Sequence, residues 1–154
     1  MDRTDQRILD ALLENSDRSR RDIARRVGIS EPSVSKKIAN LKSEGLIRGF
    51  TVNIDYDKVG FHTNAITFLR LRNQSRETAA TVVQSFWKVN EAVEIYSTFG
   101  EWHLYVRWHC RSNAHLMDLL KNAMPPEVEH SQTVTFGEEH KREKSPRLLP
   151  PAEG

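Results

Sequence analysis

The chain has 154 residues, a mass of 17.8 kDa and a formal net charge of +2, with 38% hydrophobic and 29% charged residues. This is the balance of a globular protein with room for one ordinary domain or two small ones, and no apolar run is long enough to cross a bilayer. Because the first residues lack a secretory signal and Cys110 is the single cysteine, we expect a cytoplasmic protein without an internal disulfide, metal site or cofactor.

The first helix is predicted over residues 4–14, where apolar residues recur at helical spacing and Asp2 or Thr4 can cap the start. The expected inner stripe consists of Ile8, Leu9, Leu12 and Leu13. A second helix is expected to begin at Ser19, because Ser19 and Asp22 have the S-x-x-D spacing of a capping box.

A turn is predicted between the second helix and a third helix at residues 31–44. Gly28 can adopt the left-handed conformation that ends a helix, and Ser30 offers an oxygen to cap the next one. Two helices joined by a short turn with glycine form a helix-turn-helix motif.

The third helix has two different faces. Val34, Ile38 and Leu41 share one side and predict a core contact, while small polar and basic residues lie opposite. Residues 18–48 also hold nine lysines and arginines against three acidic residues, and such a concentration is typical of nucleic-acid binding. A solvated surface explains the apolar spacing equally well, but not this clustering of charge. The predicted DNA-binding residues are Arg20, Arg21, Arg25, Arg26, Ser30, Ser33, Ser35, Lys36, Lys37 and Asn40.

Gly45 is expected to end the third helix, and the β-branched and aromatic residues of 46–54 favour a short wing or connecting strand. The N-terminal part, residues 1–52, is therefore predicted as a winged helix-turn-helix domain.

Five stretches of this region resemble the Lrp/AsnC family, the feast/famine transcription regulators. They are D-x-x-I-L-x-x-L at 5–12, D-I-A-R-R-V-G-I-S at 22–30, S-V-S-K-K-I-A-N-L at 33–41, G-L-I-R-G-F at 45–50 and D-Y-D-K-V-G-F at 55–61. The last stretch is similar to the family's linker, so we assign 53–62 to a linker. The resemblance implies a transcription regulator that binds double-stranded DNA.

The rest of the chain predicts a second domain, residues 63–138, with the element order βαββαβ. This order is the ferredoxin-like arrangement of an α+β fold, with helices on one sheet face, so the other face is most simply buried on a second copy. The closing residues 139–154 are charged and proline-containing, and we expect a flexible tail. Strands are predicted at 64–71, 92–99, 102–110 and 128–136, and helices at 76–88 and 113–123. The expected inner side of the first of these helices consists of Ala79, Val82, Val83, Phe86 and Trp87.

The resemblance also implies a small-effector site, often for an amino acid, at the turn between the second and third strands. The family commonly has T-G-x-Y-D there, and His103 stands where that motif has aspartate. The chain therefore lacks the carboxylate that meets an effector's ammonium group. The corresponding residues are Thr98, Phe99, Gly100, Glu101, Trp102 and His103.

The third strand is expected to have an apolar face with Trp102 and Cys110 and a polar face with His103 and His109. The polar face fits a hydrogen-bonded dimer contact or a solvated sheet edge, and a metal, haem-like or pH-responsive site remains the alternative.

The sequence thus favours a DNA-binding regulator that acts as a homodimer, or as a tetramer or octamer built from dimers, with no enzymatic activity and no membrane partner. A sirohaem decarboxylase-like enzyme built on the same two domains is the first alternative, because the histidines near the third strand leave it open. An architectural DNA protein without sequence preference is the second.

Overall fold

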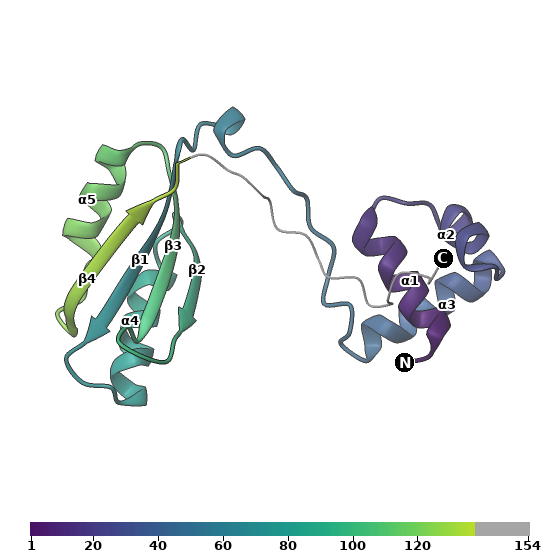
Figure 1. Cartoon of the computed structure of the whole chain (residues 1–154), viewed down its shortest axis with the longest axis horizontal. Helices are drawn as coiled ribbons and strands as arrows, with labels where there is room; N and C mark the ends of the chain where they lie inside the picture. The colour runs from purple at the N-terminus through teal and green to yellow at the C-terminus, as the bar shows by residue number, and fades with distance from the viewer. Residues whose placement is uncertain (138–154) are drawn as a thin grey trace, which may run out of the picture. The chain divides into compact units, whose positions relative to one another are not determined.

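The computed structural model describes residues 1–137, which fall into two compact units that divide between Asn53 and Ile54 (Figure 1). Within these residues, no helix is long and apolar enough to cross a membrane. The predicted tail at 139–154 lies outside the described residues.

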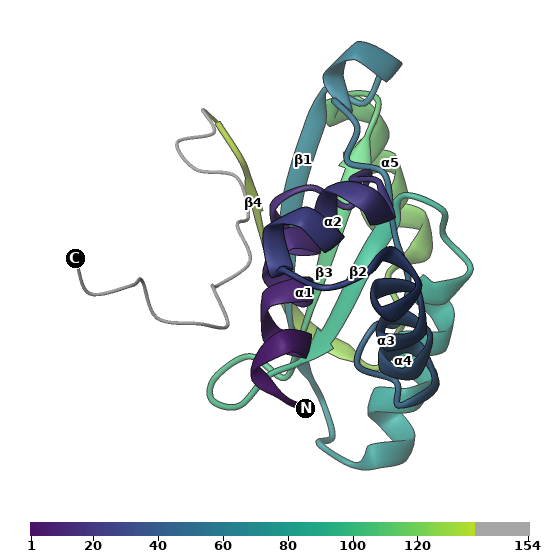
Figure 2. The same ribbon diagram turned by 90° about the vertical axis from the view of Figure 1, so that its right-hand side faces the viewer.

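The first unit consists of three α-helices: α1 (Arg3–Glu14), α2 (Arg20–Val27) and α3 (Glu31–Ser43), which Figure 2 shows from a second side. Local signals set their ends as predicted. Ser19 and Ser30 cap α2 and α3, and Gly28 ends α2 at a φ of 81°. The helices enclose their own small core, which includes Ile8, Ile23, Ala24, Val27, Val34, Ile38 and Leu41.

Three details of this unit differ from the sequence prediction. Leu13 is exposed, and Ala11 is buried in the α1 stripe instead. The reciprocal capping box occurs between Asp2 and Asp5 of α1, whereas Asp22 of α2 pairs with Arg25. Residues 46–54 form no strand. The reason is that a lone extended segment has no strand to receive its backbone hydrogen bonds, because the other elements of this unit are helical.

The second unit is a four-stranded antiparallel sheet in the order β2-β3-β1-β4, with α4 and α5 packed against one face (Figure 1). This confirms the predicted βαββαβ order and the β2–β3 hairpin. The elements are the 3-10 turn η1 (Asp57–Val59), β1 (Thr63–Leu71), α4 (Arg76–Trp87), β2 (Ala92–Ser97), β3 (Leu104–Cys110), α5 (Asn113–Ala123) and β4 (Val128–Thr135).

The core of this unit lies between the helices and the sheet. The indole of Trp108 is fully buried, packs edge-on against Phe86 and donates its Nε1–H to the Thr67 hydroxyl at 2.9 Å. Trp87, predicted to face inward, is 80% exposed, because it ends α4 and lies one position beyond Phe86 on the wheel. Trp102 precedes β3 and contacts Phe68, so it does not belong to the apolar core face.

The opposite face of the sheet, called here the open face, carries Phe68, Tyr96, Tyr105, Arg107 and Val134. These residues alternate with the core residues of the same strands, and they are half-buried or exposed. Neither α4 nor α5 packs there, since both belong to the core on the other side. The two domains are thus an all-helical unit and a sheet with one uncovered face.

Candidate nucleic-acid interface

The outward face of α3 presents Ser33, Lys36 and Asn40 to solvent, directly opposite the buried Val34 and Ile38. The three side chains lie three or four residues apart, so they form one row along the helix. Hydroxyl, ammonium and amide groups can all bond the edges of bases in the major groove. Ser35 is also exposed, but it lies on the flank of this row.

Lys37, predicted to contact DNA, is engaged within the chain. Its Nζ lies 2.7 Å from Asp2 Oδ2 and 2.8 Å from Asp5 Oδ1, at the start of α1. The hydrogen bonds from Lys37 lower the pKa of Asp2 to about 2 and also lower the pKa of Asp5. The same two bonds raise the pKa of Lys37. Sequence spacing could indicate the Asp2–Asp5 cap, but not a partner more than 30 residues away.

The four arginines of α2 are not equivalent. Arg26 forms an ion pair with Glu14 at 2.6 Å, and Arg25 lies 3.7 Å from Asp22. Arg20 and Arg21 have no ion pair within residues 1–137, which leaves them available to phosphates.

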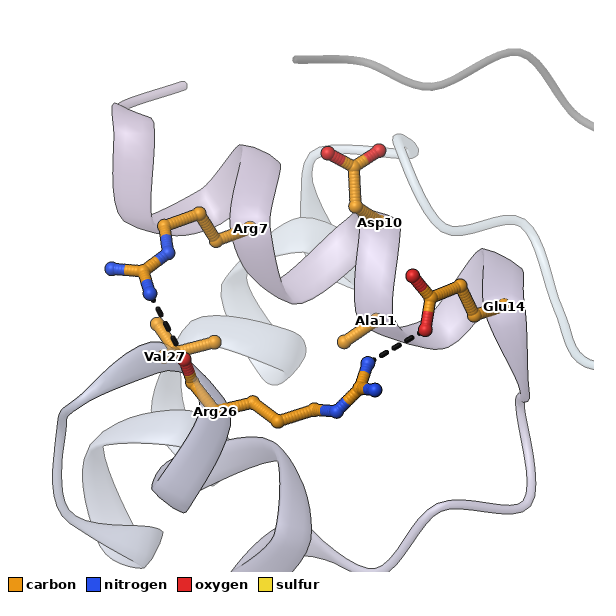
Figure 3. Close-up of a pocket in the computed structure, with 6 residues that line it drawn as sticks. All are labelled: Arg7, Asp10, Ala11, Glu14, Arg26 and Val27. Atoms are coloured by element: carbon orange, nitrogen blue, oxygen red, sulfur yellow. Dashed lines mark hydrogen bonds and ion pairs between the residues drawn. The ribbon is translucent and has the colours of Figure 1, made fainter. Parts of the chain in front are cut away.

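A shallow pocket of about 260 Å³ lies between α1 and α2 (Figure 3). Arg7 spans its rim and donates to the backbone carbonyl of Arg26 at 2.9 Å, while the Arg26 guanidinium reaches Glu14 on the other side. The basic groups around this pocket therefore hold the two helices together. The remaining lining residues are Asp10, Ala11 and Val27.

Ser30 also has a structural role, because its hydroxyl caps α3. Its Oγ accepts from the Ser33 backbone N–H at 3.3 Å and lies 2.7 Å from Ser33 Oγ. Ser33 is still exposed at the first turn of the helix. Of these two serines, Ser33 therefore has the better placement for a base or phosphate contact.

The predicted effector residues form one closed turn between β2 and β3. The Thr98 backbone N–H donates to the His103 carbonyl at 2.9 Å, and its hydroxyl donates to the Trp102 carbonyl at 2.6 Å. Gly100 has a φ of 123°, a conformation that favours glycine. Phe99 is fully exposed, and Glu101 is exposed as well. The turn brings all six predicted residues to one end of the sheet, where β2 ends and β3 begins.

His103 connects this turn to the end of β1. Its Nδ1 accepts a hydrogen bond from the Leu71 backbone N–H at 3.0 Å, and its Nε2 lies 2.7 Å from Nε2 of the Gln74 side-chain amide. Because Nδ1 is an acceptor here, the ring proton lies on Nε2, and this N–H bonds Gln74 when the amide turns its oxygen toward the ring. Gln74 was not predicted from sequence, and nothing in the spacing indicates it.

His109 lies at the other end of the polar face of β3, and it does not join other side chains that could bind a metal ion together among the described residues. Its ring stacks on Tyr56, with centroids 4.0 Å apart, and burial lowers its pKa, with Arg107 adding to the effect. Burial also raises the pKa of the Cys110 thiol to about 11, so the thiol stays protonated. Within residues 1–137, no group of three histidine, cysteine or acidic side chains is arranged to hold a metal ion.

Known protein families match both units. A family described as winged helix-turn-helix DNA-binding matches residues 1–48, and one described as Lrp/AsnC ligand binding domain matches residues 64–146. The HTH-type transcriptional regulator Ptr1 of Methanocaldococcus jannaschii is 34% identical over 102 residues, which span 66% of this chain and 67% of Ptr1. The regulatory protein AsnC of Escherichia coli is 23% identical over 136 residues, 88% of each chain.

Solved structures show the same fold. E. coli AsnC superposes with a TM-score of 0.85 at 20% identity, covering 94% of this chain and 97% of AsnC. A transcriptional regulator from Neisseria meningitidis, solved as a complex with L-Met, also has a TM-score of 0.85 at 18% identity, with 92% and 93% covered.

Proposed function

Because the chain belongs to the Lrp/AsnC family of transcription regulators, which join a DNA-binding domain to a ligand-binding domain, we propose that it recognises a specific operator as a homodimer and responds to an amino acid. The observation that carries the DNA part is the exposed row of Ser33, Lys36 and Asn40, which stands opposite the α3 core in the most basic third of the chain. A helix with this row can enter the major groove and read base edges.

Phosphate contacts then come from α2. Arg20 and Arg21 are the favoured candidates, because Arg25 and Arg26 already have acidic partners. Backbone contacts of this kind set the position of a protein on DNA and carry no sequence information themselves. We assign sequence reading to α3 and positioning to the first turn of α2.

A second copy is the natural cover for the open face of the sheet. The ring centroids of Phe68 and Tyr105 lie 6.5 Å apart, and the Tyr105 ring stacks on the Tyr96 ring with centroids 5.1 Å apart. An aromatic row therefore crosses three strands. No described residue supplies a hydrogen-bond partner to the buried Asn64 Oδ1, Arg107 Nε and His109 Nδ1 of β1 and β3. A two-fold related sheet can bury the aromatic row and supply polar partners, and dimers of this kind can build a tetramer or octamer.

A dimer with two α3 helices implies an operator with two-fold symmetry. Its half-sites are expected about one helical turn apart, or a multiple of that distance. The linker at 53–62 separates the two proposed domains, 1–52 and 63–138.

The effector site is proposed at the Thr98–His103 turn. Since Nδ1 of His103 already accepts from Leu71 and Nε2 carries the ring proton, the ammonium group of an amino acid needs another acceptor. Glu101 is the carboxylate within the turn, and it is exposed. The N. meningitidis neighbour, with its L-Met, supports an amino acid as the class of effector.

We infer that the protein is a cytoplasmic regulator without catalytic activity, cofactor or membrane partner. The relatives are named as regulators of transcription or as regulatory proteins. The alternative of a sirohaem decarboxylase-like enzyme rests on His103 and His109, and these side chains contact other groups of the chain: His103 bonds Leu71, and His109 stacks on Tyr56. A pigmented protein after purification would point to the enzyme instead.

The test is binding to the DNA upstream of its own gene against random DNA, at two salt concentrations, with and without a pool of amino acids. Sequence-specific regulators prefer their sites by roughly 10³ or more, so we expect at least that ratio. A shift of the ratio on addition of the pool would support the effector. Equal binding to both DNAs at both salt concentrations would favour the architectural alternative.

A further inference from the structure

We propose that Lys37 is a positioning residue of the recognition helix: its ammonium ties α3 to the first turn of α1 through Asp2 and Asp5, and it supports DNA reading without touching DNA. This inference rests on the proposed function, because it assigns roles within the same interface. It separates Lys37 from its sequence neighbour Lys36, which is exposed on the outward row.

All four carboxylate oxygens around Lys37 are in use. Asp2 Oδ1 accepts from the Asp5 backbone N–H at 2.8 Å, and Asp5 Oδ2 accepts from the Asp2 backbone N–H at 2.7 Å. The other oxygen of each carboxylate accepts from Lys37 Nζ, at 2.7 and 2.8 Å. The carboxylates are therefore fixed by the helix cap before the lysine binds them, and less conformational freedom is lost when the bridge forms.

The position of Lys37 agrees with an internal role. The side chains of Lys37 and Asp5 are 28% and 15% exposed, so this half of the bridge lies against the protein, while Asp2 is 59% exposed and completes the bridge from the solvent side. Lys37 lies on α3 beside the buried Ile38, between the core side of the helix and its outward row. A bond from this point to α1 limits how α3 can rotate or slide over the small core.

The charge balance gives a second reason. Asp2 and Asp5 bring two negative charges next to a helix that we expect to enter DNA, where they repel phosphates. Lys37 offsets part of this charge while it stays in place. If Lys37 turned toward a phosphate, both carboxylates would lose their shared partner at the interface.

The experiment measures the ratio of operator affinity to random-DNA affinity, and its salt dependence, for the full chain and five variants, the fifth of which combines Lys37→Gln with both asparagine substitutions. Lys37→Gln removes the bridge. The double variant Asp2→Asn, Asp5→Asn removes the bridge but keeps the lysine, and it should preserve the start of α1 because asparagine also caps helices well. Lys36→Gln is the matched control with the same loss of charge. Lys37→Arg is the conservative variant. Circular dichroism confirms that each variant is folded at the temperature of the assay.

We expect Lys37→Gln and the double asparagine variant each to lower the operator-to-random ratio, roughly fivefold. Combining all three substitutions should lower it no further, because the residues act as one unit. Lys37→Arg should keep the ratio. The salt slope should stay unchanged in Lys37→Gln and fall by about 0.9 in Lys36→Gln, the value for one lost phosphate contact.

Two results would overturn the inference. The first combines two measurements: the salt slope falls in Lys37→Gln as much as in Lys36→Gln, and the operator-to-random ratio of the double asparagine variant is unchanged or higher. Lys37 would then contact DNA itself. The other is an unchanged ratio in both bridge variants. If Lys37→Gln does not fold, the double asparagine variant decides alone. A wild-type chain without operator preference would instead refute the proposed function.

Discussion

Replacing Ile38 with alanine tests whether the two cores are independent. Ile38 is 3% exposed in the core of the helical unit, and none of its core neighbours belongs to the sheet unit. Truncating a buried isoleucine to alanine costs about 2–5 kcal/mol, partly through the cavity that remains. A unit of 53 residues is expected to have roughly 3–8 kcal/mol of stability in total. The substitution should therefore remove about half of the stability of this unit, and leave the sheet unit intact.

The assay is thermal unfolding with two probes. Far-ultraviolet circular dichroism at 222 nm reports the helices of both units, α1–α3 in one and α4 and α5 in the other. Fluorescence reports the sheet unit alone, because Trp108 and the other tryptophans all lie outside the helical unit. The transition seen by circular dichroism and not by fluorescence is therefore that of the helical unit, called here the helical transition. Ile38→Ala should lower the helical transition by 10 °C or more, on the order expected for a domain this small, without moving the fluorescence transition. Val106→Ala, in the core of the sheet unit, should do the reverse. If both variants shift both transitions together, the cores are coupled and the reasoning is wrong.

Three other predictions concern DNA, acid and assembly. Lys36→Ala and Asn40→Ala should each weaken operator binding by about 1–3 kcal/mol without unfolding the chain, as measured by titration of labelled operator, and unchanged affinity for both would exclude this docking of α3. Since the folded-state pKa of Asp2 is about 2, below its ordinary value of 3.8, its contribution to stability is complete above about pH 3.8 and disappears as the pH falls toward 2. The melting temperature of wild type minus that of Asp2→Asn should therefore shrink over this pH range, and a constant difference would contradict the assignment. Phe68→Lys on the open face should convert the proposed dimer to a folded monomer in sedimentation, and a dimer of unchanged affinity would place the interface elsewhere.

The helix ends were predictable because each depends on a few neighbouring residues. Ser19 and Ser30 cap the helices that follow them, and Gly28 has the positive φ that its position requires. The apolar spacing of Val34 and Ile38 likewise set the buried side of α3. These signals are local, so a single sequence contains them.

Side-chain partners distant in the sequence were not predictable. Lys37 has the same residue type and nearly the same place as Lys36, and only the position of α1 beside α3 separates their roles. Trp87 has the hydrophobicity of a core residue, and its exposure follows from its place at the last turn of α4. Residues 46–54 have strand-forming composition but lack a neighbouring strand, so composition alone gave the wrong structure there.

The turn proposed to bind an effector shows how this limit affects function. The motif indicates where the turn lies, and Gly100 gives it the expected conformation, because both properties are local. What the turn can bind depends on His103, whose ring is held by a backbone amide of β1 and by a side chain beyond the end of that strand. A carboxylate in the same place has four lone-pair sites and could bond Leu71 and an effector together, whereas the imidazole has one acceptor nitrogen, and Leu71 occupies it. We therefore expect histidine at position 103 to change the chemistry of the proposed site more than its shape, and we propose that Glu101 or a group from another copy of the chain meets the ammonium group.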